Sequence, residues 1–353
     1  MKLLVFVLSL LLCLSANAAI NAKIPPQAAI ATAHPLATQA GKDILQAGGN
    51  AFDAAVAITA VLAVVEPYSS GLGGGGFWLL RDQKQQKTIM LDGREAAPLN
   101  AHRDMYLDKN GDYIPSSSVN GSLAAGIPGT VAAMVHLSEN YGKLPLKQLL
   151  YSAIKYAEQG FPVTPHYQKM AGFRLSVLQQ YKSSAAVFLS DNKVPSLGHL
   201  IIQTDLAQTL KLIADKGNAG FYQGIVAEQL INAVSADKGI WQFNDLKNYT
   251  IKERNAIQFQ YNDMTITSVA PPSSGGIALA SILQILQNYD LQAMNVVSRT
   301  HLIVEAMRRA YRDRAEFLGD SDFSTVPVER LTHVWYAAGL KQGIQLDQAT
   351  PSS

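Results

Sequence analysis

The sequence predicts an α+β fold in which helices precede and follow short pairs of strands. Two apolar runs, Phe77–Leu80 and Thr88–Leu91, flank the polar turn Asp82–Lys87, a pattern that predicts a hairpin. Ile257–Phe259 and Met264–Val269 predict a second strand pair further along the chain. Segments with helical spacing lie before and after these pairs. We therefore expect a layered architecture in which helices pack on sheets.

The first predicted helices lead into a glycine-rich loop. Ala37–Ala47 has helical spacing and is closed by Gly48-Gly49. Phe52–Val65 is apolar on every side, which indicates a helix buried all round. Pro67–Gly76 then forms a loop before the first strand. Later helices are predicted at Thr130–Asn140, Leu146–Gln159, Gln168–Tyr181, Leu206–Lys216, Gly224–Val234, Gly276–Gln287 and Arg299–Phe317.

The first 18 residues have the layout of a secretory signal peptide. A basic start at Met1-Lys2 precedes the apolar run Leu3–Leu14, and Ala16-Asn17-Ala18 offers an A-x-A cleavage site before Ala19. The apolar run is about a dozen residues long, whereas a bilayer-spanning helix needs roughly 20. We therefore expect a periplasmic or secreted protein; a retained N-terminal anchor is the alternative interpretation.

Composition excludes several function classes. The only cysteine, Cys13, lies in the predicted leader, so residues 19–353 contain no cysteine nucleophile and no thiolate metal ligand. The formal net charge of +2 gives no indication of a nucleic-acid partner or an anionic membrane surface. Charged residues make up 16% of the chain, against about 25% in average soluble domains. A large enzyme core and a permanent partner subunit both explain this low fraction.

Familiar cofactor, metal and nucleophile patterns are absent from the sequence or out of context. Gly71–Gly76 matches G-x-G-x-x-G by letter, but a helix precedes it and a strand follows, the reverse of a dinucleotide site. This segment is better interpreted as a tight loop that permits close backbone contacts. None of the seven histidines has H-x-x-x-H or H-E-x-x-H spacing, and there is no G-x-S-x-G motif. We expect neither a metal nor a cofactor.

Arg94 is the candidate binding residue. It lies in Asp92-Gly93-Arg94-Glu95, directly after a short apolar strand. A planar guanidinium at a strand end can bind a carboxylate through two parallel hydrogen bonds. The alternative is a loop ion pair with Glu95 or Asp92, and the spacing alone favours that alternative.

Seven motifs, taken together and in this order, resemble the γ-glutamyltransferase family, also called γ-glutamyltranspeptidase or glutathione hydrolase. The resemblance runs from about Ala31 to Ser353, and its specificity comes from the number and order of the motifs. They are Gly48–Ala57 (GGNAFDAAVA), Glu66–Phe77 (EPYSSGLGGGGF), Asp92–Pro98 (DGREAAP), Gly126–Thr130 (GIPGT), Phe221–Gly224 (FYQG), Pro271–Gly276 (PPSSGG) and Leu318–Phe323 (LGDSDF).

The resemblance implies an N-terminal nucleophile hydrolase with an αββα sandwich, made as a precursor that cuts itself into two subunits. Residues 19–353 would be the large subunit, in a heterodimer with a small subunit that completes the fold. The catalytic threonine is expected in a Thr-Thr-His motif downstream of Ser353, so no catalytic residue is assigned in this chain. The resemblance also implies that Arg94 binds the α-carboxylate of glutathione or another γ-glutamyl substrate, whereas spacing alone favours a loop ion pair.

Two alternatives to this function stay open at the level of sequence. A relative with the same fold could instead remove acyl side chains from β-lactam (cephalosporin) antibiotics, because Arg94 would serve either substrate carboxylate. A non-catalytic binding protein could also keep the fold. A Thr-Thr-His motif downstream of Ser353 would favour an enzyme, and its loss would favour the binding protein.

Overall fold

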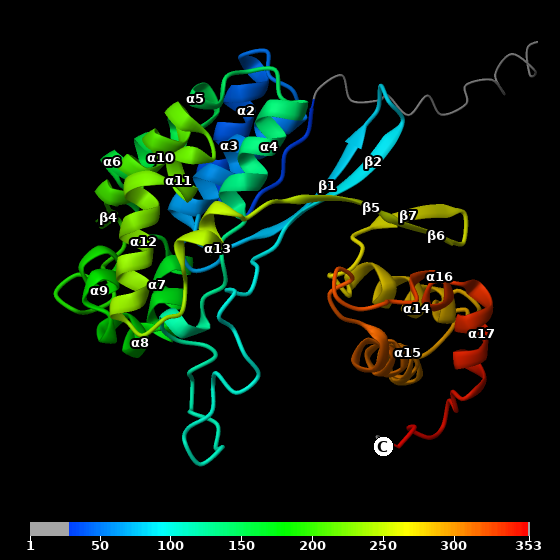
Figure 1. Cartoon of the computed structure of the whole chain (residues 1–353). Coiled ribbons are helices and arrows are strands. Elements are labelled where there is room, and N and C mark those ends of the chain that lie inside the picture. The colour runs from blue at the N-terminus through cyan, green and yellow to red at the C-terminus, as the bar shows by residue number, and fades with distance from the viewer. Residues whose placement is uncertain (1–27, 352–353) are drawn as a thin grey trace, which may run out of the picture.

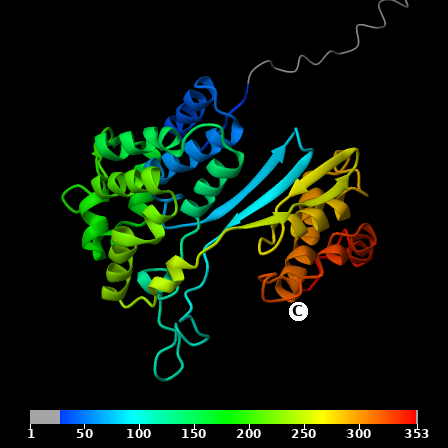
Figure 2. The same ribbon diagram turned by 45° about the horizontal axis from the view of Figure 1, so that its top comes forward.

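A computed structural model describes residues 28–351, so the predicted leader at residues 1–18 lies outside the described part. Two lobes are joined by antiparallel strands that run between them, as Figure 1 and Figure 2 show. The larger lobe is helical, and the smaller lobe combines a strand pair with helices (Figure 1). The predicted mixture of helices and short antiparallel strand pairs is confirmed.

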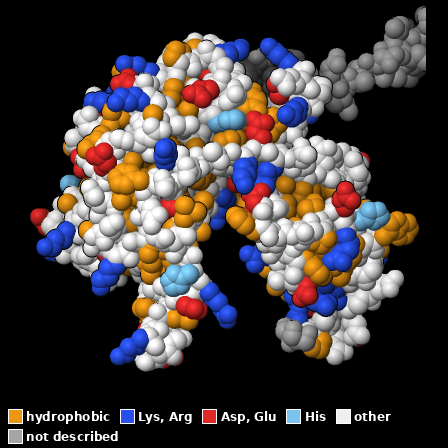
Figure 3. Space-filling model, viewed as in Figure 1, with side chains coloured by type: hydrophobic (Ala, Val, Ile, Leu, Met, Phe, Trp, Pro, Cys, Tyr) orange, Lys and Arg blue, Asp and Glu red, His pale blue; other side chains and the backbone are white. Residues whose placement is uncertain are grey.

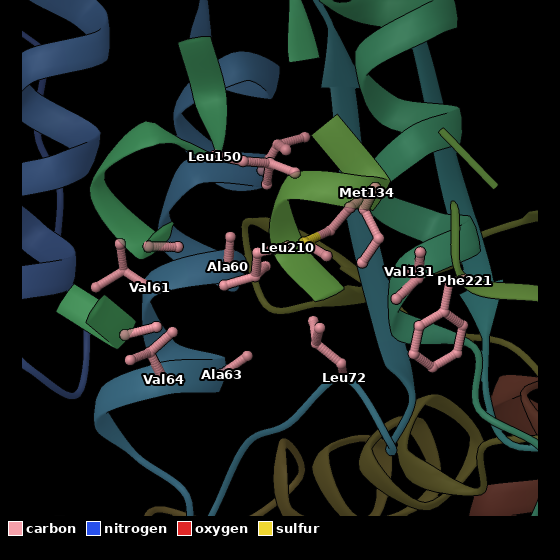
Figure 4. Close-up of a cluster of buried hydrophobic side chains, with 14 of the residues drawn as sticks. Ala60, Val61, Ala63, Val64, Leu72, Val131, Met134, Leu150, Leu210 and Phe221 are labelled. Atoms are coloured by element: carbon pink, nitrogen blue, oxygen red, sulfur yellow. The ribbon is translucent and has the colours of Figure 1, made fainter. Parts of the chain in front are cut away.

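The larger lobe encloses the main hydrophobic core. Buried side chains from α3, α4 and α10 meet there, including Val64, Met134 and Leu210 (Figure 4). Its helices are α2 (Pro35–Gln46), α3 (Ala51–Val65), α4 (Thr130–Tyr141), α5 (Leu146–Leu149), α6 (Tyr151–Gln159), α7 (Pro165–Phe173), α8 (Leu175–Gln180), α9 (Lys182–Phe188), α10 (Thr204–Lys216), α11 (Ala219–Tyr222), α12 (Gly224–Ala236) and α13 (Phe243–Lys247), with the short strands β3 (Phe161–Pro162) and β4 (Leu200–Ile201) and the 3₁₀ turn η1 (Ser122–Ala124).

Helix α3 shows how polar groups fix an almost wholly apolar segment. Asn50 Oδ1 accepts from the backbone N–H groups of Phe52 and Asp53, both at 2.9 Å, while the Asp53 carboxylate accepts from Asn50 N at 2.8 Å. This capping box satisfies N–H groups that the first helical turn leaves unpaired. Asp53 is completely buried and also accepts from Lys143 N at 3.0 Å. The same carboxylate therefore anchors the segment after α4 to the start of α3.

The central sheet has the order β1-β2-β5, with β1 at Gly76–Asp82, β2 at Lys87–Gly93 and β5 at Lys252–Asn255. Both strand pairs are antiparallel, and the register places Trp78 opposite Leu91. These two side chains pack against the core of the larger lobe. Met90 points to the opposite face and belongs to the core of the smaller lobe, as expected for the two-residue period of a strand. Strand β2 is therefore covered on both faces.

The smaller lobe consists of the β6–β7 hairpin and four helices, which lie below the hairpin in Figure 1. Ile257 of β6 and Ile277 of α14 share its core with Met90, which ties this lobe to the central sheet. No helix within residues 28–351 has both the length and the apolarity to span a bilayer. The elements are β6 (Ile257–Tyr261), β7 (Met264–Ser268), α14 (Gly275–Leu286), α15 (Val296–Phe317), α16 (Val328–Leu331) and α17 (Val334–Gln342).

Differences from the sequence prediction have local causes. The predicted helix Gln168–Tyr181 divides into α7 and α8 at Arg174, whose φ of −104° and ψ of 10° interrupt the helix. The Arg174 guanidinium donates to Asn120 Oδ1 at 2.6 Å, a contact that sequence periodicity does not report. Strand β5 was not predicted, because Lys252–Asn255 reads Lys-Glu-Arg-Asn and has no apolar side chain. That missed strand carries residues of the candidate site.

Candidate functional site

Three glycine-containing segments meet where β2 ends. A Cβ on Gly75 would lie 2.4 Å from the carbonyl oxygen of Gly93, and one on Gly129 would lie 2.0 Å from the same oxygen. The contact is reinforced by Gly129 N and Thr130 N, which donate to the Gly74 carbonyl at 2.9 and 3.1 Å. The glycine-rich loop thus permits close backbone contact, as its sequence context predicts. The loop therefore contacts both the end of β2, directly before Arg94, and the start of α4.

The backbone of Arg94 is held from both sides. Its N–H donates to Asp92 Oδ1 at 3.1 Å, and its carbonyl accepts from the Tyr249 hydroxyl at 2.7 Å. Burial, with a further contribution from the Asp92 and Glu95 carboxylates, raises the pKa of Tyr249 well above 10, so its hydroxyl remains a donor. The Tyr249 ring stacks on Tyr222, with centroids 5.7 Å apart and planes 6° from parallel. Two hydrogen bonds and a stacked aromatic pair therefore fix the position of the Arg94 Cα.

The Arg94 side chain, in contrast, is 56% exposed and forms an ion pair with the neighbouring Glu95. Of the two partners considered from sequence, Glu95 thus contacts the guanidinium, while Asp92 contacts only the backbone N–H of Arg94. Ion pairs at this exposure contribute about 0–1 kcal/mol. The guanidinium can therefore exchange Glu95 for the carboxylate of a ligand at little cost in free energy.

A second arginine, Arg254 on β5, lies beside the first but is 16% exposed. Its Nε donates to Asp92 Oδ2 at 2.7 Å, and its Nη2 donates to Asp322 Oδ2 at 2.7 Å. Lys252 also pairs with Asp322. Hydrogen bonds from Arg254 and Lys252 hold the pKa of Asp322 well below its usual range. Asp322 is therefore ionised and fully paired.

Sequence reasoning missed Arg254, Lys252 and Tyr249. A usable signal was present, because Lys252 and Arg254 are two residues apart and would share one face of a strand. The polar composition of that strand hid the signal.

An open cavity of about 460 Å³ lies in front of these residues. Figure 3 shows that the molecule is hollowed between its two lobes. Pro272, Asp320 and Phe323 line the cavity together with Arg94, so the PPSSGG and LGDSDF motifs reach the same place as DGREAAP. The FYQG motif contributes indirectly, since Tyr222 supports Tyr249. Motifs spread over more than 200 positions thus surround one cavity. Within residues 28–351 there is no cluster of three or more His, Cys, Asp or Glu side chains able to hold a metal ion.

The convergence of these motifs agrees with a comparison of the chain with known families. Residues 37–353 match the model of the gamma-glutamyltranspeptidase family. The chain belongs to the gamma-glutamyltranspeptidase family.

Relatives and a solved structure of the family cover most of this chain, which in turn covers differing shares of their length. The chain is 41% identical over 325 residues to the glutathione hydrolase proenzyme of Bacillus subtilis (strain 168), covering 90% of this chain and 55% of that protein. It is 39% identical over 330 residues to that of Escherichia coli (strain K12), covering 93% and 57%. The crystal structure of Helicobacter pylori gamma-glutamyltranspeptidase matches with a TM-score of 0.89 at 40% identity, covering 93% of this chain and 95% of that one. The chain therefore spans slightly more than half the length of these curated relatives.

The close contact between Gly129 and the Gly93 carbonyl predicts a loss of stability when Gly129 is replaced in this gamma-glutamyltranspeptidase family chain. In Gly129→Ala the new Cβ would lie 2.0 Å from Gly93 O and 2.1 Å from the Tyr249 hydroxyl oxygen. Since φ at Gly129 is −117°, the strain is steric, and we expect the free energy of unfolding to fall by about 2–3 kcal/mol. Urea denaturation measures this change. The matched control is Gly339→Ala in α17, where nothing lies within 4 Å; it should gain up to about 1 kcal/mol. Equal stability of the two variants would contradict the packing argument.

Proposed function

We propose that this chain is the large-subunit portion, residues 19–353, of an enzyme that cleaves the γ-glutamyl amide bond of glutathione and related compounds. The γ-glutamyl group would pass to water or to the amine of an amino acid or peptide acceptor. The observation that carries the proposal is the half-exposed guanidinium of Arg94, held on a fixed backbone beside an open cavity. Relatives named glutathione hydrolase proenzymes, at about 40% identity, support the same activity.

Arg94 would bind the α-carboxylate and so orient the γ-carbonyl of the substrate. The nucleophile would be a threonine downstream of Ser353, freed as the first residue of a small subunit by self-cleavage of the precursor. Its hydroxyl adds to the γ-carbonyl and gives its proton to its own α-amine, whose pKa of about 7.7–8 suits a base near neutral pH. The amine then returns the proton to the leaving nitrogen. A γ-glutamyl ester remains, which water or an acceptor amine cleaves.

The small subunit would complete an αββα sandwich with this chain. Among the described residues no strand pairs with the outer edge of β1. An unpaired strand edge offers backbone donors and acceptors to another strand. On β1, Leu79 is 42% exposed, a further indication that this region is covered in the assembled enzyme. The solved Helicobacter pylori chain is covered to 95%, whereas the Bacillus subtilis proenzyme is covered to 55%, which also supports a division into two chains.

Arg94 variants of the complete gene product test the proposed function. The wild type should release the amine from a chromogenic γ-glutamyl anilide and from glutathione. Arg94→Ala should lower kcat/KM by about 100-fold, since losing a bidentate charged pair costs about 3 kcal/mol. Arg94→Lys should recover only part, because an ammonium keeps the charge but not the planar fork. Steady-state kinetics and thermal melting of each variant provide the measurements, and melting should change little.

Arg81→Ala is the matched control, because Arg81 is also exposed on the same hairpin but bonds only Gln86 and Thr88. It should keep wild-type kcat/KM. Residues 19–353 expressed alone should give no turnover, since the proposed nucleophile lies outside them. A properly processed Arg94→Ala enzyme with wild-type kcat/KM for glutathione would exclude the carboxylate role. Turnover of a cephalosporin but not of glutathione by the wild type would favour the acylase alternative.

We also propose that the protein is exported to the periplasm or beyond, with removal of residues 1–18. The basic start, the short apolar run and Ala16-Asn17-Ala18 support this. Intact-mass spectrometry of the protein recovered from the periplasm or medium should give an N-terminus at Ala19. A mass that retains the leader would instead indicate an N-terminal anchor.

A further inference from the structure

Arg254 differs from Arg94 because each of its three guanidinium nitrogens donates to a protein group. Nε donates to Asp92, Nη2 to Asp322 at 2.7 Å, and Nη1 to Asp322 Oδ1 at 3.1 Å and Ser321 Oγ at 3.4 Å. Its side chain is 16% exposed. An arginine that donates from every nitrogen and is largely buried beside a cavity is suited to holding other groups in place.

A continuous series of hydrogen bonds leads from Arg254 to Arg94. Asp92 accepts Arg254 Nε on Oδ2 at 2.7 Å and the Arg94 backbone N–H on Oδ1 at 3.1 Å. The Asp92 side chain is 8% exposed, so little water is available to replace either donor. Because both oxygens are engaged, the orientation of the carboxylate depends on Arg254. If Arg254 is shortened, the carboxylate is free to turn away from the Arg94 N–H.

The other end of Arg254 holds the opposite wall of the cavity. Asp322 lies in the loop after α15, in the LGDSDF motif, and its N–H donates to Asp320 Oδ1 at 3.0 Å. Lys252 pairs with the same Asp322 carboxylate. Asp320, Asp322 and Arg254 all line the cavity together with Arg94. A single guanidinium therefore spans from the end of β2 to a loop of the smaller lobe.

We propose that Arg254 is a positioning residue for recognition of the substrate's α-carboxylate, acting on Arg94 through Asp92 and on the facing loop through Asp322. The inference rests on the proposed function, in which Arg94 binds that carboxylate. The planar fork is essential, because three nitrogens must reach two carboxylates in different directions. Lysine at this position keeps a positive charge but cannot hold Asp92 and Asp322 at once.

The test is a mutant cycle in the complete enzyme. Arg254→Lys should raise KM for the γ-glutamyl anilide on the order of tenfold with kcat changed less than about threefold, because ground-state binding is weakened. In an Arg94→Ala background the same substitution should have a much smaller effect, limited to the contribution of the Asp322 loop, since residues acting through one another are not additive. The inhibition constant of L-glutamate should rise with KM, whereas that of 4-aminobutyrate, which lacks the α-carboxylate, should not change.

Arg309→Lys is the matched control. Arg309 is 12% exposed and bonds Glu305 Oε2 at 2.7 Å and the Leu340 carbonyl at 2.8 Å, outside the cavity. It should lower the melting temperature as Arg254→Lys does while leaving KM at the wild-type value. If Arg254→Lys does not fold, Asp322→Asn, which removes the charge but keeps the shape, should also raise KM, by a smaller factor.

Three outcomes would overturn the inference while leaving the proposed function intact. They are an Arg254→Lys enzyme with wild-type KM, an effect fully additive with Arg94→Ala, or an equal rise in the inhibition constants of L-glutamate and 4-aminobutyrate. A wild-type enzyme without γ-glutamyl turnover would instead refute the proposed function.

Discussion

The candidate site depends on the close contact of three backbone segments around the carbonyl of Gly93. Gly75 and Gly129 approach so closely that a Cβ on either would overlap that oxygen. With side chains in this contact, β2 could not pack against both the glycine-rich loop and the start of α4. The chain would then lose the geometry that brings Tyr249 to the Arg94 carbonyl. Glycine is required here for contact distance, not for an unusual φ, since φ at Gly129 is −117°.

The two arginines near this contact differ in burial and in bonding. Arg254 has its nitrogens bonded and is 16% exposed, whereas Arg94 has a fixed backbone and a 56% exposed guanidinium. Because the Arg94 backbone is already fixed, ligand binding loses less conformational entropy. The exposed ion pair with Glu95 is weak, so a ligand carboxylate can replace Glu95. In the proposed function, the buried charges hold the geometry and the exposed guanidinium binds the α-carboxylate of the substrate. The buried contacts of Arg254 keep the cavity wall rigid although the cavity is open to solvent.

Sequence patterns predicted the parts of this structure that burial dictates. The apolar Phe52–Val65 run predicted α3 to within one residue, and two apolar runs on either side of a polar turn predicted β1 and β2. Periodicity failed for β5, because a strand recruited for its charged side chains has no apolar pattern. Spacing could place Arg94 at a strand end but could not separate ligand binding from an ion pair with Glu95. The network through Arg254 joins residues 92, 254 and 322, and only the tertiary fold brings them together.

The central claim is that Arg94 leaves Glu95 to bind an α-carboxylate while its backbone stays fixed. A crystal structure of the complete enzyme with bound L-glutamate tests it most directly. Two nitrogens of Arg94 should lie about 2.7–2.9 Å from the α-carboxylate oxygens, with the Asp92–Arg254 and Tyr249–Arg94 hydrogen bonds unchanged. An intact Arg94–Glu95 pair, with the α-carboxylate bound by other residues, would contradict it.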